Sequence, residues 1–281
     1  MKDFKDKVAV ITGAASGIGR ALAENCFKEG MKVMLADIEE SALLQAEKEL
    51  KAAGAEVLAV LTDVSKATDV ENLAQKTLEK FGAVHLLFNN AGVGGHGPIW
   101  ENTIKDWQWI LGVNLWGVVH GIRTFIPIMI KQDAESHVVN TASGFGLITG
   151  SGIYGVTKHA VVALTEILAN NLKSNKITNI KVSVLCPGIV NTRILDADRN
   201  RQAEYENEEP LDPAAEAELE EGREKMKAFY ATNMAPETVA DITFQDIRKN
   251  RLYIVTDNQI KGFFQQRSKK IMKAIDAHGE P

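Results

Sequence analysis

The chain has 281 residues, and its 32 basic and 37 acidic side chains give a formal net charge of -5. With 45% hydrophobic and 25% charged residues, it has the composition of an ordinary globular protein, which excludes a disordered chain, a disulfide-stapled miniprotein and a collagen-like fibre. A pI of about 5.8 argues against nucleic acid as the main partner, because such a partner needs a basic face.

Short apolar runs alternate with helical patterns over the first two thirds of the chain. The apolar runs predict six strands, at Val8–Thr12, Lys32–Ala36, Glu56–Leu61, Val84–Phe88, His137–Asn140 and Lys181–Cys186. Helical patterns lie between them, at Ala21–Lys28, Glu40–Ala53, Ala67–Lys80, Ile104–Ile130 and Lys158–Leu172. Most of the strands lack strict alternation, which is typical of a sheet buried on both faces. The sequence therefore predicts an α/β fold with a doubly wound parallel sheet.

No linker rich in proline, glycine or serine divides the chain, so we expect one domain over residues 1–281. Residues 196–224 hold twelve acidic side chains against three arginines, a density typical of a mobile, solvated segment. We interpret 194–235 as a helical substrate lid and 257–281 as a basic C-terminal tail. The lid's apolar side chains are expected to close over the substrate while its carboxylates face water; they are Ile194, Leu195, Met226, Phe229, Tyr230 and Met234.

One stretch, Trp109 to Ile130, is apolar and long enough to cross a bilayer. Asn114, His120 and Arg123 interrupt it, which favours a long buried helix at a subunit interface over a membrane span. The first seven residues contain no apolar signal segment, and the two cysteines lie far apart, as is typical of free thiols in a reducing compartment. We therefore expect a cytoplasmic protein.

A glycine-rich turn follows the first strand, with the sequence Thr12-Gly-Ala-Ala-Ser-Gly-Ile-Gly19. Its glycines allow the backbone to turn tightly and to approach a diphosphate, and the helix that follows offers unpaired N–H groups at its positive end. The spacing differs from the common G-x-G-x-x-G. A purely structural strand-to-helix turn is the alternative.

Asp37 ends the second strand, 24 residues after Gly13. At this place a carboxylate accepts hydrogen bonds from the ribose hydroxyls of an adenosine and repels a 2′-phosphate. No basic residue follows in Ile38-Glu39-Glu40, so NAD is favoured over NADP. A surface aspartate without a ligand is the alternative.

Tyr154 and Lys158 are four residues apart at the start of a helix, and therefore lie on one face. The ordinary pKa of tyrosine is near 10, and a nearby ammonium and an oxidised nicotinamide lower it toward the range of a useful base. The pair follows a strand that ends in Asn140-Thr-Ala-Ser143, which brings a hydroxyl to the edge of the sheet where ligands bind.

These motifs together resemble the ordered set of the short-chain dehydrogenase/reductase family, over residues 7 to about 193. The set is Thr12-Gly-x-x-x-Gly-x-Gly19, Asp63, Asn89-Asn-Ala-Gly92, Asn114, Ser143, Tyr154-x-x-x-Lys158 and Pro187-Gly188. The resemblance implies a Rossmann fold that binds a nicotinamide dinucleotide. It also implies cofactor contacts from Gly13, Ser16, Gly17, Ile18, Gly19, Asp37, Asp63, Val64, Asn90, Ala91, Gly92, Tyr154, Lys158, Pro187, Gly188, Ile189 and Thr192.

The same resemblance implies four catalytic roles. Tyr154 would be the general acid/base, and Ser143 would hydrogen-bond the substrate oxygen. Lys158 would hold the nicotinamide ribose and depress the pKa of Tyr154. Asn114 would bend its helix and hold a water that relays protons to Lys158. Asp63 would meet the adenine amino group.

Three features depart from the family pattern. Ser143 and Tyr154 are only 11 residues apart, so the glycine-rich loop between them is short. The glycine pair that usually follows the last strand, here Leu252–Thr256, is missing, which leaves the mode of assembly open. The basic tail is expected to be a solvated helix, with a membrane-surface role as the alternative.

The leading hypothesis is an NAD-dependent oxidoreductase that interconverts a secondary alcohol and a ketone, with an apolar and possibly cyclic substrate. The alternatives are an NADP-dependent carbonyl reductase and a non-catalytic dinucleotide-binding sensor or scaffold; no G-x-S-x-G motif supports a serine hydrolase. His96 is a candidate substrate contact, and no histidine has the spacing of a metal ligand. We expect a homodimer or homotetramer, and neither nucleic acid nor membrane as a partner.

Overall fold

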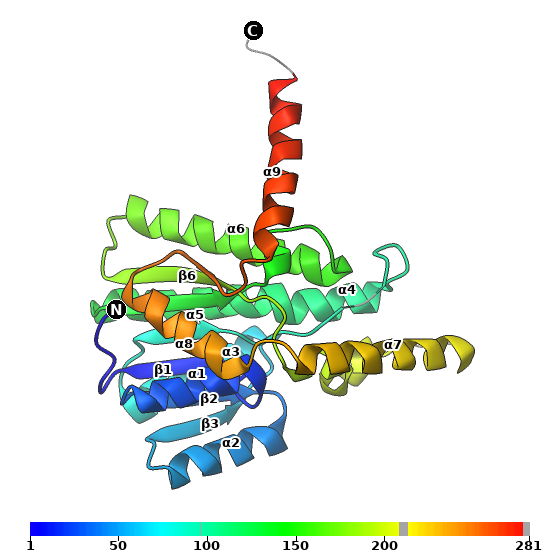
Figure 1. The fold of residues 1–281 in the computed structure, drawn as a ribbon. Helices are drawn as coiled ribbons and strands as arrows, with labels where there is room; N and C mark the ends of the chain where they lie inside the picture. The colour runs from blue at the N-terminus through cyan, green and yellow to red at the C-terminus, as the bar shows by residue number, and fades with distance from the viewer. Residues whose placement is uncertain (96, 208–212, 278–281) are drawn as a thin grey trace.

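Seven parallel strands form one sheet in the computed structural model, in the order β3-β2-β1-β4-β5-β6-β7 (Figure 1). They are β1 (Val8–Thr12), β2 (Lys32–Asp37), β3 (Val57–Leu61), β4 (Leu86–Asn89), β5 (Ser136–Thr141), β6 (Ile180–Cys186) and β7 (Tyr253–Val255). The structure describes residues 1–95, 97–207 and 213–277, leaving aside the side chains of 213–219. Because β2 and β4 pair with opposite edges of β1, the chain direction across the sheet reverses there. The predicted doubly wound parallel sheet is confirmed.

Helices cover both faces of the sheet. One layer consists of α1 (Gly17–Lys28), α2 (Glu40–Ala52) and α8 (Pro236–Arg248), and the other of α3 (Ala67–Phe81), α5 (Gly117–Gln132) and α6 (Gly152–Ser174). Successive residues of β1 face alternate layers: Ala9 and Ile11 pack with α1, whereas Val10 packs with α3 and α5. Both faces of the strand are therefore buried, which explains its uninterrupted apolar sequence.

The long helix expected at 104–130 is divided. It consists of α4 (Ile104–Leu111), a π-helical turn at Gly112–Trp116 and α5. Within the described residues, this stretch, Ile104–Gln132, is the one long and apolar enough to cross a membrane, with a mean hydropathy of 1.3. Its α5 part packs into the layer beneath the sheet through Phe125 and Met129, which are fully buried, so it is a core helix of the domain.

Two helices extend away from the sheet (Figure 1). The first is α7 (Pro213–Ala231), which follows two short 3₁₀ turns at Arg193–Asn200 and Ala203–Tyr205. The second is α9 (Ile260–Asp276), which has no buried residue and points away from the body of the molecule. The first turn of α9 nevertheless lies close to β5, because Ile260 approaches Gly144.

Candidate active site

A cavity of about 1020 Å³ lies at the carboxyl ends of the strands. All the residues that the sequence suggested for cofactor binding line it, together with Ser143. They come from the turns that follow the strands and from the first turns of α1 and α6, which meet at this edge of the sheet. Of the four expected catalytic residues, Asn114 does not line the cavity, because its side chain is fully buried.

The glycine-rich turn after β1 has the backbone that an anion site needs. Gly13 and Gly17 have φ angles of 67° and 53°, which favour glycine. A side chain at Gly19 would overlap the carbonyl oxygen of Gly13, so the two backbone segments touch. Helix α1 has no side-chain cap from Ser16 and no acidic residue in its first turn. Its N-terminal N–H groups and the positive end of its dipole are thus available to a diphosphate.

Asp37 lies at the end of β2 with both carboxylate oxygens engaged. They accept hydrogen bonds from the backbone N–H of Ala15 at 2.9 Å and of Glu39 at 3.0 Å. Burial raises the pKa of Asp37 and outweighs the lowering by these hydrogen bonds. Each oxygen retains a lone pair for a further donor.

Two arginines pair with Glu39, two residues after Asp37, and line the same cavity as Asp37. Arg193 and Arg199 come from the segment after β6 and pair with Glu39 at 3.3 and 3.0 Å. The sequence after Asp37, Ile38-Glu39-Glu40, contains no basic residue, but the folded chain brings these two arginines to Glu39. The sequence around Asp37 could not reveal these arginines because they lie more than 150 residues away along the chain.

Asp63 follows β3 and holds the loop in place. Its Oδ1 accepts hydrogen bonds from the backbone N–H and the hydroxyl of Ser65, at 3.0 and 2.6 Å. Its Oδ2 accepts one from Gln202 Nε2 at 3.1 Å and lies 3.3 Å from the ammonium of Lys66. Gln202 belongs to the segment after β6 and lines the cavity, a placement that nothing in the sequence pattern signalled.

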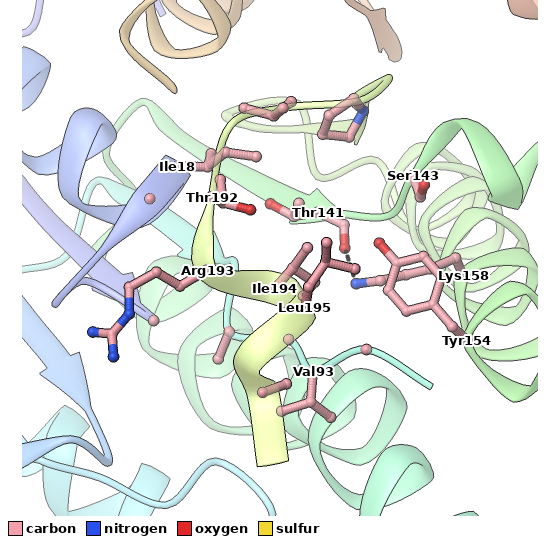
Figure 2. A pocket seen from close by; sticks show the side chains of 18 of the residues that line it. Ile18, Val93, Thr141, Ser143, Tyr154, Lys158, Thr192, Arg193, Ile194 and Leu195 are labelled. Carbon is pink, nitrogen blue, oxygen red and sulfur yellow. Dashed lines mark hydrogen bonds between the residues drawn. The ribbon is translucent and has the colours of Figure 1, made fainter. Parts of the chain in front are cut away.

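Ser143, Tyr154 and Lys158 lie together at the other end of the cavity (Figure 2). The ammonium of Lys158 is 5.4 Å from the centre of the Tyr154 ring and donates a hydrogen bond to the carbonyl oxygen of Thr141 at 2.9 Å. The hydroxyls of Ser143 and Tyr154 face the same space (Figure 2). Ser143 and Tyr154 are only 11 residues apart, and the loop between them turns through left-handed backbone angles at Ser151 and Gly152, with φ of 62° and 53°.

Burial is the main cause of the pKa shifts of Tyr154 and Lys158. It raises the pKa of Tyr154 to about 12, although a hydrogen bond with Ser143 opposes the shift. It also lowers the pKa of Lys158 to about 8. Without a ligand, desolvation of the phenolate is the largest effect on the Tyr154 pKa. The expected lowering by the ammonium together with an oxidised nicotinamide concerns the cofactor-bound protein and stays a prediction.

Asn114 lies in the π-helical turn between α4 and α5. Its side chain accepts a hydrogen bond from the backbone N–H of Val93 at 2.8 Å and donates one to the carbonyl of the same residue at 3.0 Å. It also donates to the Thr157 hydroxyl at 3.2 Å. The irregular helix thus fastens the loop after β4 to α6, which carries Tyr154 and Lys158.

Apolar side chains line the cavity near Tyr154. They include Ile194, Leu195, Met226 and Tyr230 from the segment expected to be a lid, and Phe145, Ile148, Ile260 and Phe263 from elsewhere. Two expected lid contacts are absent from the wall: Phe229 is half exposed, and Met234 packs against the core beside Val190. His96 lies outside the described residues.

Ion pairs hold the acidic segment, residues 196–224, in place. Arg201 pairs with Asp106 and lies 5.0 Å from the ring centre of Trp109. Lys227 of α7 pairs with Asp196 at 2.8 Å, and Arg223 approaches Asp198 at 3.6 Å. Several carboxylates expected to face only water therefore hold the segment against α4 and against α7.

Comparison with known proteins agrees with this geometry. A sequence model of the short chain dehydrogenase family matches residues 7–203. The "CLA biosynthesis dehydrogenase/reductase" of Lactiplantibacillus plantarum is 38% identical, over 99% of this chain and 98% of its own. The "C alpha-dehydrogenase" of Sphingobium sp. strain SYK-6 is 31% identical, over 98% of this chain and 88% of its own.

A solved structure resembles the whole chain. It is a short-chain dehydrogenase/reductase from Burkholderia phymatum in complex with NAD, 44% identical, with a TM-score of 0.92 over 98% of this chain and 97% of that one. The family match, the Rossmann sheet and the cavity at its carboxyl edge lead to one conclusion. This chain belongs to the short-chain dehydrogenase/reductase family and is an NAD(P)-dependent oxidoreductase that acts on CH–OH groups.

Proposed function

We propose that this oxidoreductase interconverts a secondary alcohol and a ketone, with NAD as its preferred cofactor and an apolar substrate, open-chain or cyclic. The observation that carries the proposal is the cluster of Ser143, Tyr154 and Lys158 at the apolar end of the cavity. A secondary alcohol presents one hydroxyl to this cluster and two carbon substituents to the apolar wall.

The residues of the cavity fit an adenine dinucleotide. The uncapped N-terminus of α1 suits the diphosphate, and the carboxylate of Asp37 retains lone pairs for ribose hydroxyls. Ile189 and Thr192, which line the same cavity, would contact the carboxamide, and Asn90 and Gly92 would support the adenosine side. When bound, the nicotinamide accepts or returns a hydride.

The protein's own residues then manage the proton and the substrate oxygen. In alcohol oxidation the hydroxyl proton moves to the phenolate oxygen of Tyr154, and in ketone reduction the Tyr154 phenol returns it to the substrate oxygen. Ser143 donates a hydrogen bond to the oxygen as negative charge develops on it. The ammonium of Lys158, held by Thr141, favours the ionised phenol. Asn114 positions Lys158 by fixing α6, and a water relay from Asn114 to Lys158 stays part of the proposal.

The preference for NAD rests on Asp37, whose carboxylate repels a 2′-phosphate. Arg193 and Arg199 are the observation that favours the NADP alternative, because guanidinium groups bind phosphate. Their pairing with Glu39 offsets their positive charge, so we retain NAD as the proposed cofactor. Fluorescence titration with both dinucleotides decides the matter: tighter binding of NADP contradicts the assignment.

The reaction class is tested with a panel of secondary alcohols of increasing size, using NAD and following reduced nicotinamide by absorbance. We expect turnover with apolar alcohols and its loss in Tyr154→Phe, while the Kd for NAD stays within about twofold. Turnover near the wild-type rate in Tyr154→Phe removes Tyr154 from its role. Failure of the whole panel, with NAD bound, favours the sensor or scaffold alternative.

We also propose that the protein is a cytoplasmic homodimer or homotetramer. Exposed apolar side chains on the helices support an oligomer: Trp116 in the π-helical turn, Val156 and Ile167 on α6, and Phe263 on α9. The two cysteines, both free and buried, are compatible with a reducing compartment. Light scattering after size-exclusion chromatography gives the oligomeric state, and a monomeric mass contradicts this part of the proposal.

A further inference from the structure

Asp257 places a carboxylate in the wall of the cavity. The residue follows β7 and is half-buried. Its Oδ1 accepts a hydrogen bond from the backbone N–H of Gln259 at 2.8 Å. In the part of the chain that the structure describes, no lysine, arginine or histidine lies within ion-pair distance of this carboxylate. The wall of the cavity therefore contains a negative charge with which no described cation pairs.

A short series of contacts joins Asp257 to the catalytic residues. A side chain at position 188 would lie 2.6 Å from Oδ2 of Asp257, so the carboxylate fills the space beside Gly188. The residue before it, Pro187, accepts a hydrogen bond from the backbone N–H of Gly144 at 2.7 Å. Gly144 directly follows Ser143 in the chain. The carboxylate of Asp257 thus belongs to the end of the cavity that holds Ser143.

We propose that the carboxylate of Asp257 favours binding of the oxidised dinucleotide over the reduced one, and so suits the enzyme to alcohol oxidation. This inference rests on the nicotinamide cofactor of the proposed function, which puts the reacting ring beside Ser143 and Tyr154. The ring carries one positive charge when oxidised and none after it has accepted a hydride. A carboxylate at this end of the cavity attracts only the charged form, so NAD is held more tightly and the reduced form, NADH, is released more readily.

Lys158 gives this carboxylate a second reason to matter. Its buried ammonium lies at the same end of the cavity, on α6, and by itself disfavours a positively charged ring there. Asp257 comes from a different segment, after β7, and its charge has the opposite sign. Without Asp257 the oxidised ring would meet the ammonium with no compensating anion at this end of the cavity, and the reduced ring would be little affected.

The proposal is tested by binding, without turnover, of NAD and of NADH. Both are titrated by calorimetry into wild type, Asp257→Asn and Asp3→Asn. Asparagine retains the shape of aspartate and the oxygen that accepts the Gln259 N–H, and removes only the charge. Asp3 is the matched control: its Oδ1 also accepts a backbone N–H two residues on, from Lys5 at 3.1 Å, but it is exposed and lies outside the cavity wall.

We expect Asp257→Asn to weaken NAD binding about three- to tenfold, which is the size of an attraction between two partly solvated charges several ångströms apart. Binding of NADH should stay within about twofold of wild type, because its ring carries no charge. The ratio of the two dissociation constants should therefore move toward NADH by about three- to tenfold. Asp3→Asn should retain the wild-type ratio.

Three outcomes overturn the inference. Equal weakening of NAD and NADH in Asp257→Asn assigns the residue only to supporting the loop at Gly188. No change in either dissociation constant shows that its charge does not act on the ring. Failure of wild type to bind either dinucleotide overturns the proposed function as well, and so separates that failure from the first two.

Discussion

Lys158 is a buried ammonium that has no carboxylate partner among the described residues, and its removal should stabilise the protein. Lys158 is only 3% exposed, and its ammonium donates a hydrogen bond to the carbonyl oxygen of Thr141 at 2.9 Å. Burial lowers its pKa from 10.5 to about 8. At about 1.4 kcal/mol per pH unit, holding the charged form inside the fold costs about 3 kcal/mol of unfolding free energy at neutral pH.

The dependence on pH follows from the direction of this shift. In the unfolded chain the lysine remains protonated up to about pH 10.5, whereas in the folded protein it loses its proton above about 8. Between these values the unfolded state binds more protons, so the stability contributed by this residue rises with pH. Below pH 8 both states are protonated and the full cost remains.

Lys158→Met should therefore be more stable than wild type by about 2 kcal/mol at pH 7, after about 1 kcal/mol is deducted for the hydrogen bond to Thr141. Above pH 8 this advantage should shrink by about 1.4 kcal/mol per pH unit. Urea unfolding of the cofactor-free protein, followed by tryptophan fluorescence from pH 6.5 to 9.5, measures it. Lys48→Met, on the exposed face of α2, serves as the control.

Two results would refute this reasoning. The first is a difference between wild type and Lys158→Met that stays constant across the pH range, because it would mean that the lysine does not titrate there. The second is a variant less stable than wild type at pH 7, which would mean that the hydrogen bond outweighs desolvation. A pH trend shared by Lys48→Met would assign the effect to other groups.

Three further predictions follow from the cofactor site and its support. Glu39→Gln frees the two arginines that line the same cavity as Asp37 and should tighten NADP binding about tenfold relative to NAD, measured by fluorescence titration; an unchanged ratio contradicts the pairing. Gly19→Ala should weaken dinucleotide binding at least tenfold, since its methyl group overlaps the backbone of Gly13 in the phosphate turn; calorimetry checks it, and wild-type affinity would exclude the close approach. Asn114→Leu should lower the free energy of unfolding by about 2–4 kcal/mol, because it leaves the backbone of Val93 unpaired, and urea unfolding should show the loss.

Local patterns were enough to predict the sheet. Most of the predicted strands are runs of buried side chains, and burial on both faces of a sheet leaves a continuous apolar signature in the sequence. The exception is β3 at the edge of the sheet, where Leu61 is exposed. The glycine-rich turn could also be predicted from the sequence, because the positive φ angles at positions 13 and 17 favour glycine. The family resemblance then named the expected cofactor-binding residues, and the structure brings all of these together in one cavity.

The contacts that sequence reasoning missed are those between distant segments. Gln202 meets Asp63 across 139 residues, and Arg199 meets Glu39 across 160. No periodicity encodes such pairs, since they depend on the path of the segment after β6. A bend at Asn114 was expected only from the family resemblance, since no local pattern marks the π-helical turn there. The side chain of Asn114 bonds Val93, which lies in another loop.

The short segment from Thr192 to Tyr205 touches both halves of the cavity. Ile194 and Leu195 lie near Tyr154, while Arg199 and Gln202 reach the region of Asp37 and Asp63. Any change of this segment that reshapes the substrate end will shift the residues at the adenosine end as well. Variants selected for new alcohols should thus drift in cofactor affinity, and compensating changes should arise on β2 and β3, far from the reacting carbon.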